Sequence, residues 1–326
     1  MFLMIEIHQI DFSDMTFCVS FPLESPAVSA SIGMVGVINP IIVSGCPCQG
    51  KYQIVAGFRR AFACRDIGLA QIPAQIYSVD PDNPLAAFCL ALYENLAHRT
   101  FNAVECAEIL RKLSAQFRCP ADELAQTFLP ALGLPRSAKT LDAYLRLAAF
   151  DNEQKRHLAG QELPLGLIEL LAALPPEDRG AAFRLMTAVN INQNKLRELL
   201  TMAEEIALRD GCALRDALAD PEILGVLAHE KFSAPQKLDA IRAALRRRRF
   251  PRLTALEQEY AAALKRLKSP QGVQLAADRY FEDDALTATF RFESRDQLAA
   301  VADELRQFAA QPELETLLRL IQGQSQ

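Results

Sequence analysis

Hydrophobic positions are spaced in two different ways along this chain, and the spacing changes near residue 85. Before that point, three runs rich in Val and Ile are separated by Pro, Gly and Asp, which is typical of short buried strands. A helical pattern, FRRAFACRDIGL, follows the second run. Residues 28–80 therefore predict a small α/β unit with strands in VGVINPIIV, YQIVAG and IPAQIYSV.

From residue 85 to about residue 245, Leu and Ala recur every three or four positions, as on the apolar face of a helix. Turn-forming sequences such as LGLPRS, AALPPEDRG and NINQNK interrupt this pattern. We therefore expect this part of the chain to be entirely helical.

After Pro251 the pattern predicts one helix, LTALEQEYAAALKRLK, and then two alternating strands, VQLAADRYF and ALTATFRFE, joined by an acidic turn at residues 282–284. A last helix is expected after Ser294, which has Gln297 three residues later as in a capping box. A two-stranded sheet is at best marginally stable alone. We therefore expect this C-terminal module to pair with a second copy, giving a homodimer.

These patterns divide the 326 residues into three parts. A chain of this length exceeds one ordinary compact core. We expect an N-terminal α/β domain at residues 1–100, an all-helical domain at 101–245 and a small α+β dimerisation module at 250–326. The predicted fold class is α+β and multidomain.

The formal net charge of −5 provides no general attraction to nucleic acid, so any nucleic-acid binding must use a local basic surface. Four consecutive arginines, residues 246–249, are either such a surface or a solvated helix end that interacts with the helix dipole. No apolar run approaches the roughly 20 residues of a membrane span, and the first residues lack the basic start of a signal peptide. We expect a cytoplasmic protein without a membrane partner.

The stretch YQIVAGFRRAFA contains the first candidate site. A glycine between a strand and a helix lets the backbone turn tightly, and the free amides of the new helix attract phosphate. Arginines in the first turn add fork-shaped donors that match phosphate oxygens. Gly57, Arg59 and Arg60 therefore indicate an anion-binding site, and the alternative is a surface arginine pair matched by carboxylates of the chain.

The stretch ENLAHRTFNAVE provides a second set of polar side chains. Asn102 is suited to cap a helix with Glu105 as its capping-box partner, which is a structural role. Glu94 and Asn95 have no such role. A carboxylate and an amide oxygen side by side are suitable ligands for Mg²⁺, which usually takes its other ligands from phosphates.

In this order, SIGMVGVINPIIV, YQIVAGFRRAFA, IPAQI and ENLAHRTFNAVE resemble the sequence boxes of the N-terminal domain of ParB, the chromosome and plasmid partition protein. Its fold is related to that of sulfiredoxin. In the ParB family these boxes bind CTP with Mg²⁺. The resemblance implies that Gly57, Arg59 and Arg60 bind the nucleotide phosphates and that Glu94 and Asn95 bind the metal.

Three positions depart from the family's boxes and remove polar groups from the expected site. Phe58 replaces a glutamate, Phe62 replaces an arginine, and His98 replaces the arginine of the third box. Arg99 is a candidate substitute for that last arginine, although its direction on a helix differs by about 100°. Phe58 also stands where sulfiredoxin has its cysteine, and we expect Cys64, two turns further on, to lie in the core.

Residues 119–150 are interpreted as two helices around a turn at residues 133–135. Their place after the boxes resembles that of the ParB helix-turn-helix, whose second helix enters the DNA major groove. An ordinary helical hairpin is the alternative, because the link before the turn is about four residues longer than usual and contains Pro130. The candidate DNA-binding residues are Arg136, Ser137, Lys139 and Thr140.

As a whole, the chain resembles a divergent ParB protein, which implies a nucleoid-associated homodimer that binds double-stranded DNA. The resemblance implies a clamp that closes when CTP joins two N-terminal domains, and at most a weak CTPase. It also implies a ParA-type ATPase as a partner, usually engaged through a basic tail, but MFLMIEIHQIDF contains no Lys or Arg.

Two alternatives stay open. One is a nucleotide-independent transcription regulator or accessory DNA-binding protein. The other is a ParB-like nuclease or kinase, although the sequence shows no cluster of paired carboxylates with a histidine to support it.

Overall fold

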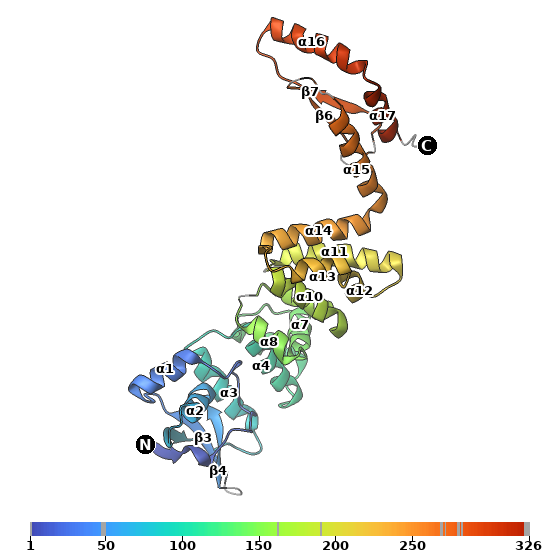
Figure 1. Cartoon of the computed structure of the whole chain (residues 1–326). Coiled ribbons are helices and arrows are strands. Elements are labelled where there is room, and N and C mark those ends of the chain that lie inside the picture. The colour runs from blue at the N-terminus through green and yellow to red at the C-terminus, as the bar shows by residue number, and fades with distance from the viewer. Residues whose placement is uncertain are drawn as a thin grey trace. The chain divides into compact units, whose positions relative to one another are not determined.

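A computed structural model describes residues 2–322 apart from residues 47–49, 162, 190, 268–269, 271, 279–280 and 282. The chain divides into two compact units, Met1–Phe183 and Arg184–Gln326. The three-part division stays a prediction, and the first unit contains both the α/β domain and the start of the helical region (Figure 1).

The first unit begins with a five-stranded mixed sheet in the order β1-β5-β3-β4-β2. The pairs β1–β5 and β3–β4 are antiparallel, and β3–β5 and β2–β4 are parallel. The Val and Ile side chains of its strands that are completely buried include Ile41, Val43, Ile54, Val55 and Ile72. The strands are β1 (Leu3–Glu6), β2 (Ile10–Asp11), β3 (Ile41–Cys46), β4 (Lys51–Ala56) and β5 (Gln71–Ile76).

Helices pack against this sheet: α2 contacts β3, and α3 contacts β4 (Figure 1). Besides a short 3₁₀ turn, η1 (Ile7–Gln9), the α/β part contains α1 (Pro26–Val35), α2 (Phe58–Asp66) and α3 (Pro84–Leu96). The prediction of a small α/β unit is confirmed.

The strand expected in VGVINPIIV is shorter than predicted, because its first residue, Val35, is the last of α1 and residues 36–40 precede β3. Gly36 ends this helix with a φ of +74°, and its N–H donates to the carbonyl of Ile32. Pro40 has no N–H for a strand ladder. Strand β3 therefore begins only at Ile41.

The helical region that follows is continuous, as the Leu and Ala spacing predicts. Helices α4 and α7 pack against each other, and α7 also packs against α9. The helices are α4 (Ala103–Ala115), α5 (Ala121–Glu123), η2 (Leu124–Phe128), α6 (Leu129–Ala131), α7 (Ala138–Ala148), α8 (Asn152–Ala159), α9 (Leu165–Ala173) and α10 (Pro176–Val189).

Segments α5, η2 and α6 form one continuous helix in which η2 is a π-helical turn. The N–H of Leu129 donates to the carbonyl of Leu124, five residues earlier. Pro130 follows directly, and proline cannot donate a helical hydrogen bond. The wider turn lets the helix continue past Pro130, and the turn to α7 contains Gly133 with a φ of +74°.

In the part of the chain that the structure describes, the second unit contains the end of α10, four further helices and then a small α+β module. Its first part consists of α11 (Gln193–Asp210), α12 (Leu214–Leu218), α13 (Pro221–Ala228) and α14 (Ala234–Arg249). The module consists of α15 (Pro251–Arg266), β6 (Gln274–Ala277), β7 (Leu286–Thr289), α16 (Arg295–Ala309) and α17 (Pro312–Ile321). None of the helices described combines the length and apolar character needed to cross a bilayer.

The C-terminal module has the predicted pair of antiparallel strands, β6 and β7. Ser294 caps α16 by accepting the N–H of Gln297 at 3.2 Å, and the Gln297 side chain accepts the N–H of Glu293 at 2.7 Å. The module has a small core of Leu267, Phe308 and Leu317. This core is too small to bury most of α16, whose residues are largely exposed.

The four arginines at the end of α14 are all matched by carboxylates of the same unit. Arg246 pairs with Glu257 at 2.6 Å, and Arg248 pairs with Asp210 and Asp220 at 3.2 Å. Arg247 pairs with Glu222, and Arg249 pairs with Glu205. These contacts favour the interpretation of residues 246–249 as a neutralised helix end.

Candidate phosphate-binding site

A tight turn at Gly57 joins β4 to α2, as the sequence predicts. Gly57 has a φ of +93°, which side-chain-bearing residues rarely adopt. A Cβ atom there would lie 2.8 Å from Ile41 Cγ2. The glycine is therefore required by both backbone conformation and space, and α2 begins at Phe58 with its two arginines in the first turn.

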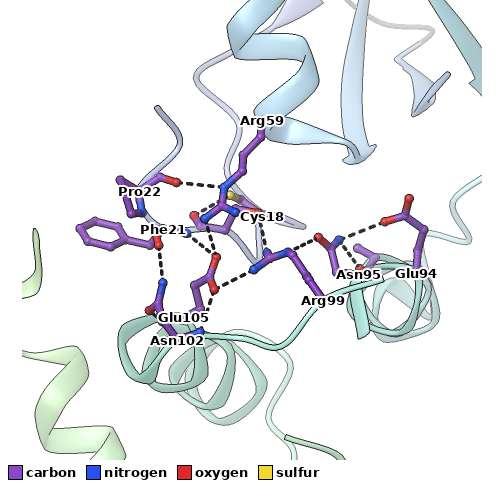
Figure 2. Close-up of polar contacts among 11 residues, drawn as sticks. Cys18, Phe21, Pro22, Arg59, Glu94, Asn95, Arg99, Asn102 and Glu105 are labelled. Atoms are coloured by element: carbon purple, nitrogen blue, oxygen red, sulfur yellow. Dashed lines mark hydrogen bonds and ion pairs between the residues drawn. The ribbon is translucent and has the colours of Figure 1, made fainter. Parts of the chain in front are cut away.

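Arg59 points from α2 toward a segment near the N-terminus (Figure 2). Its Nη2 donates to Glu105 Oε1 at 3.0 Å, and its Nε donates to the carbonyl of Pro22 at 3.2 Å. Partial burial lowers the pKa of Arg59, and the neighbouring Glu105 carboxylate opposes this effect.

Arg60 contacts different residues, on the loop before β3 and on α3. Its Nη1 donates to the carbonyls of Asn39 at 2.7 Å and Pro40 at 2.9 Å. Its Nη2 forms an ion pair with Glu94 Oε1 on α3 at 3.1 Å. Arg60 therefore ties α2 to α3 and to the entry of β3.

Glu105 is the most deeply buried charged side chain of the site, with 1% of its surface exposed. Besides Arg59, it accepts from Arg99 Nη1 at 2.8 Å. The backbone N–H groups of Phe21 and Asn102 also donate to it, at 3.1 Å and 3.0 Å. Four donors therefore satisfy this carboxylate, as a buried charge requires (Figure 2).

The capping box predicted at the start of α4 is present. Asn102 Oδ1 accepts the N–H of Glu105 at 2.9 Å, and the Asn102 side chain also donates to the carbonyl of Phe21 at 2.8 Å. Glu105 thus performs two tasks at once, because it caps α4 and also holds two arginines.

Arg99 is fixed by all three nitrogens of its guanidinium group. Besides the bond to Glu105, its Nε donates to Asn95 Oδ1 at 3.1 Å and its Nη2 donates to Ser20 Oγ at 3.0 Å. The guanidinium lies over the ring of Phe101, 4.5 Å from its centroid. His98, in contrast, is exposed.

The N-terminal segment that receives Arg59 and Arg99 is anchored by a buried lysine. Lys112 on α4 donates from Nζ to the carbonyls of Cys18, at 2.7 Å, and Met15. Burial lowers the pKa of Lys112. Gln53 on β4 also donates to Asp14 at 2.7 Å, so this segment is held from both the sheet and α4.

The polar side chains of the site form one continuous chain of hydrogen bonds. Three guanidinium groups and two carboxylates take part, which leaves one net positive charge. The order along the chain is Arg60, Glu94, Asn95, Arg99, Glu105 and Arg59.

Two hollows, each lined by at least two of the arginines, adjoin this chain of side chains. The first has a volume of about 220 Å³ and is lined by Gly57 and by all three arginines, Arg59, Arg60 and Arg99. The second, of about 450 Å³, shares Arg60, Asn95 and Arg99 with the first and is lined also by Glu94 and His98. Arg59 and Arg60 are thus paired with carboxylates of the same chain, as the alternative interpretation states, but space remains beside them.

Glu94 and Asn95, the predicted metal ligands, each already contact an arginine. Glu94 Oε1 accepts from Arg60 and Asn95 Oδ1 accepts from Arg99, while Glu94 Oε2 accepts from the Asn95 amide. Within the described residues, no group of three or more His, Cys, Asp and Glu side chains is placed to hold a metal. The assignment of Glu94 and Asn95 to Mg²⁺ stays a prediction.

Of the two aromatic departures from the ParB boxes, Phe58 lines the first hollow and Phe62 lines neither. Phe58 is buried in the core and lines the first hollow. Phe62 packs against Phe12, with ring centroids 5.2 Å apart, and Arg65 covers both rings. Cys64 is completely buried, and burial raises the pKa of its thiol to about 11. This agrees with the expectation that Cys64 belongs to the core.

The predicted DNA-binding residues lie at the start of α7, but they are not equivalent. Ser137 caps the helix by accepting the N–H of Lys139 at 3.2 Å. Arg136 and Lys139 are exposed, and Lys139 forms an ion pair with Glu169 at 2.6 Å. Thr140 is only 2% exposed and lies among the buried residues of α7. The assignment of Thr140 to a DNA-facing surface is therefore corrected, because its side chain is not accessible to a groove.

Sequence reasoning missed the position of Arg99 and the second task of Glu105. It treated Glu105 as a cap only, and it judged Arg99 by its direction relative to His98. The contacts to Ser20 and Phe21 join segments about 80 residues apart, and no local pattern reports them.

Residues 7–96 match the family model of the ParB N-terminal domain. A probable chromosome-partitioning protein ParB of Vibrio cholerae serotype O1 is 30% identical over 194 residues, which cover 60% of this chain and 58% of that protein. The chain spans about half the length of the curated relatives it matches.

Two solved structures of C-terminally truncated ParB from Caulobacter crescentus are similar to this chain. One, complexed with CTP-gamma-S, is 26% identical with a TM-score of 0.25 and covers 54% of this chain and 94% of that one. The other, complexed to the centromeric parS site, is 21% identical with a TM-score of 0.34 and covers 67% of this chain and 97% of that one. Residues 7–96 form a ParB N-terminal domain, and the chain is a distant homologue, at about 30% identity, of chromosome-partitioning ParB proteins.

Proposed function

We propose that this chain is a DNA-binding partition protein whose N-terminal domain binds a nucleoside triphosphate, with CTP as the first candidate. The observation that carries the proposal is the placement of three guanidinium groups, Arg59, Arg60 and Arg99, around one hollow beside the Gly57 turn. Guanidinium forks and the amides of a helix N-terminus are the donors that phosphate groups prefer.

The choice of CTP rests on the sequence boxes and on the ligand named for a ParB relative, CTP-gamma-S. The second hollow, of about 450 Å³, has the size of a small-ligand pocket, and Arg60, Asn95 and Arg99 line both hollows. In this proposal the phosphates lie near the three arginines and replace the contact of Arg60 with Glu94.

DNA binding is assigned to the exposed start of α7, where Arg136 and Lys139 supply positive charge and Ser137 supplies a hydroxyl group. A relative solved on the centromeric parS site suggests this duplex as the first probe. The family resemblance further implies a clamp in which CTP joins two N-terminal domains. Exposed residues of α16, among them Leu298, are then candidates for contact with a second copy in a C-terminal dimer.

A specific observation favours a second candidate, a DNA-binding protein without nucleotide chemistry. Arg59 and Arg60 already have carboxylate partners, Glu105 and Glu94. A nucleotide must therefore compete with two ion pairs of the chain, and a scaffold that has lost its ligand would show the same contacts.

Equilibrium binding of labelled CTP, with and without Mg²⁺, tests the proposal. We expect saturable binding by the full chain and a loss of about tenfold or more in Arg60→Ala, because a charge-assisted phosphate contact is removed. Arg65→Ala is the matched control, since Arg65 lies on the same helix but pairs with Asp66 away from the hollows. Absence of saturable binding at millimolar CTP would favour the nucleotide-independent candidate.

A further inference from the structure

We infer that Arg99 is the third phosphate-binding residue of this site, and that Glu105 is a positioning residue that orients Arg99 and Arg59 toward the ligand. The inference rests on the proposed binding of a polyphosphate in the two hollows. It deepens that proposal, which already places the phosphates near Arg99, by assigning to Glu105 the task of orienting Arg99 and Arg59 for the ligand.

Arg99 is placed where both parts of a polyphosphate would pass. Together with Arg60 and Asn95, Arg99 lines both the first and the second hollow. His98, which occupies the family's arginine position, lines only the second hollow and is exposed. The guanidinium group missing at position 98 is therefore present, in the interior of the site, at position 99.

The geometry of Arg99 and Arg59 is set before any ligand arrives. Three bonds fix the guanidinium plane of Arg99, and each of its two Nη atoms carries a second N–H. Arg59 uses its Nε and Nη2, and no protein oxygen in the described residues accepts from its Nη1. Donors thus remain on both arginines for a phosphate, and prior ordering lowers the entropic cost of binding.

Glu105 is suited to remain in place while the ligand binds. It is buried, and two of its four donors are backbone N–H groups, those of Phe21 and Asn102. An acceptor held in this way is a fixed support for the two guanidinium groups. A surface carboxylate would instead move with its arginine and compete with the phosphate.

Two variants of the full chain separate positioning from simple charge. Glu105→Gln adds one positive charge to the site and preserves the capping box, because Gln also serves at that helix position. If charge alone matters, this variant binds inorganic triphosphate more tightly than the wild type. Positioning by Glu105 predicts the reverse, a loss of about tenfold or more. Arg99→Lys keeps the charge but removes the fork, and we expect a loss of similar size.

Glu108→Gln is the matched control, since Glu108 lies one turn further along α4 and pairs with Lys155 and Arg111 outside the hollows. Thermal unfolding establishes that each variant is folded. If Glu105→Gln does not fold, the affinity of Arg99→Lys still tests the phosphate-binding role of Arg99. Titration calorimetry with inorganic triphosphate and with CTP gives the affinities. Unchanged or tighter binding in Glu105→Gln would overturn the positioning role, and unchanged binding in Arg99→Lys would remove Arg99 from the phosphate site.

A measurement without ligand distinguishes failure of this inference from failure of the proposed function. NMR signals of the Arg59 and Arg99 Nε–H groups should be sharp and slow to exchange in the wild type and averaged in Glu105→Gln. If the wild type binds no triphosphate, the proposed function and the ligand role of Arg99 both fail. Sharp signals in Glu105→Gln would instead show that Glu105 does not position the arginines, whatever the ligand does.

Discussion

The guanidinium group of Arg99 donates to the buried carboxylate of Glu105 at 2.8 Å, across the turn that joins α3 to α4. The same carboxylate accepts from Arg59 on α2 at 3.0 Å. One acceptor on the first turn of α4 therefore organises arginines from two different elements. Because α4 also packs against α7, the site and the proposed DNA-binding helix share one structural support.

Replacing Gly57 by Ala should destabilise the chain by about 2 kcal/mol, because the new Cβ would be strained at positive φ and would meet Ile41. Gly33→Ala is the control: Gly33 lies within α1 and nothing stands within 4 Å of an added Cβ. There we expect a gain of about 0.5–1 kcal/mol from helix propensity. Denaturant unfolding measures both changes, and equal effects of the two substitutions would contradict the account.

The ion pair of Glu108 and Lys155 should make the free energy of unfolding depend on pH in the acidic range. Burial opposes ionisation of Glu108, but hydrogen bonds from Lys155 and Arg111 hold its pKa below the ordinary value of 4.5. A depressed carboxylate pKa contributes stability that is present above the unfolded-state pKa and lost as the pH falls through the folded-state pKa.

The wild type should therefore exceed Glu108→Gln in stability by about 1 kcal/mol at pH 6, and the difference should shrink toward pH 3. Urea unfolding across this range measures it. A difference that is constant with pH would show that the pair does not stabilise the junction of α4 and α8.

DNA binding should depend on the exposed start of α7 and not on its buried residue. Arg136→Ala should weaken binding to a duplex about tenfold. Because one phosphate contact is lost, the negative slope of log K against log salt should become shallower by about one. Thr140→Val removes a hydroxyl group that is only 2% exposed, so it should leave the affinity within about twofold of the wild type. Fluorescence anisotropy with duplexes selected from a random pool measures both, and a larger effect of Thr140→Val would contradict the assignment.

The arginines at the end of α14 should contribute little to DNA affinity. Arg249→Gln removes a cation that is already paired with Glu205, so the salt dependence of DNA binding should remain unchanged. The same anisotropy titration, repeated at several salt concentrations, provides the comparison with Arg136→Ala. A reduced slope in Arg249→Gln would restore residues 246–249 as a nucleic-acid surface.

Features that depend on neighbouring residues were predictable from the sequence. Three such features follow from the chemistry of three or four adjacent positions: the turn at Gly57, the capping box of Asn102 with Glu105, and the cap of Ser294 with Gln297. The Leu and Ala spacing likewise identified the helical region.

Features that depend on distant segments were not predictable in this way. The run VGVINPIIV has strand-like composition, but Gly36 and Pro40 divide it between a helix end and a strand. The two tasks of Glu105 require Phe21 and Arg59 to approach α4, and only the tertiary fold brings them there. Thr140 looks polar in sequence, yet packing of α7 buries it.

A crystal structure of the full chain grown with CTP and Mg²⁺ tests the central claim most directly. We expect density for a triphosphate in the hollows beside Gly57, with phosphate oxygens about 2.7–2.9 Å from nitrogens of Arg59, Arg60 and Arg99. Density located elsewhere, or its absence at saturating CTP with the pairs Arg59–Glu105 and Arg60–Glu94 unchanged, would contradict the claim.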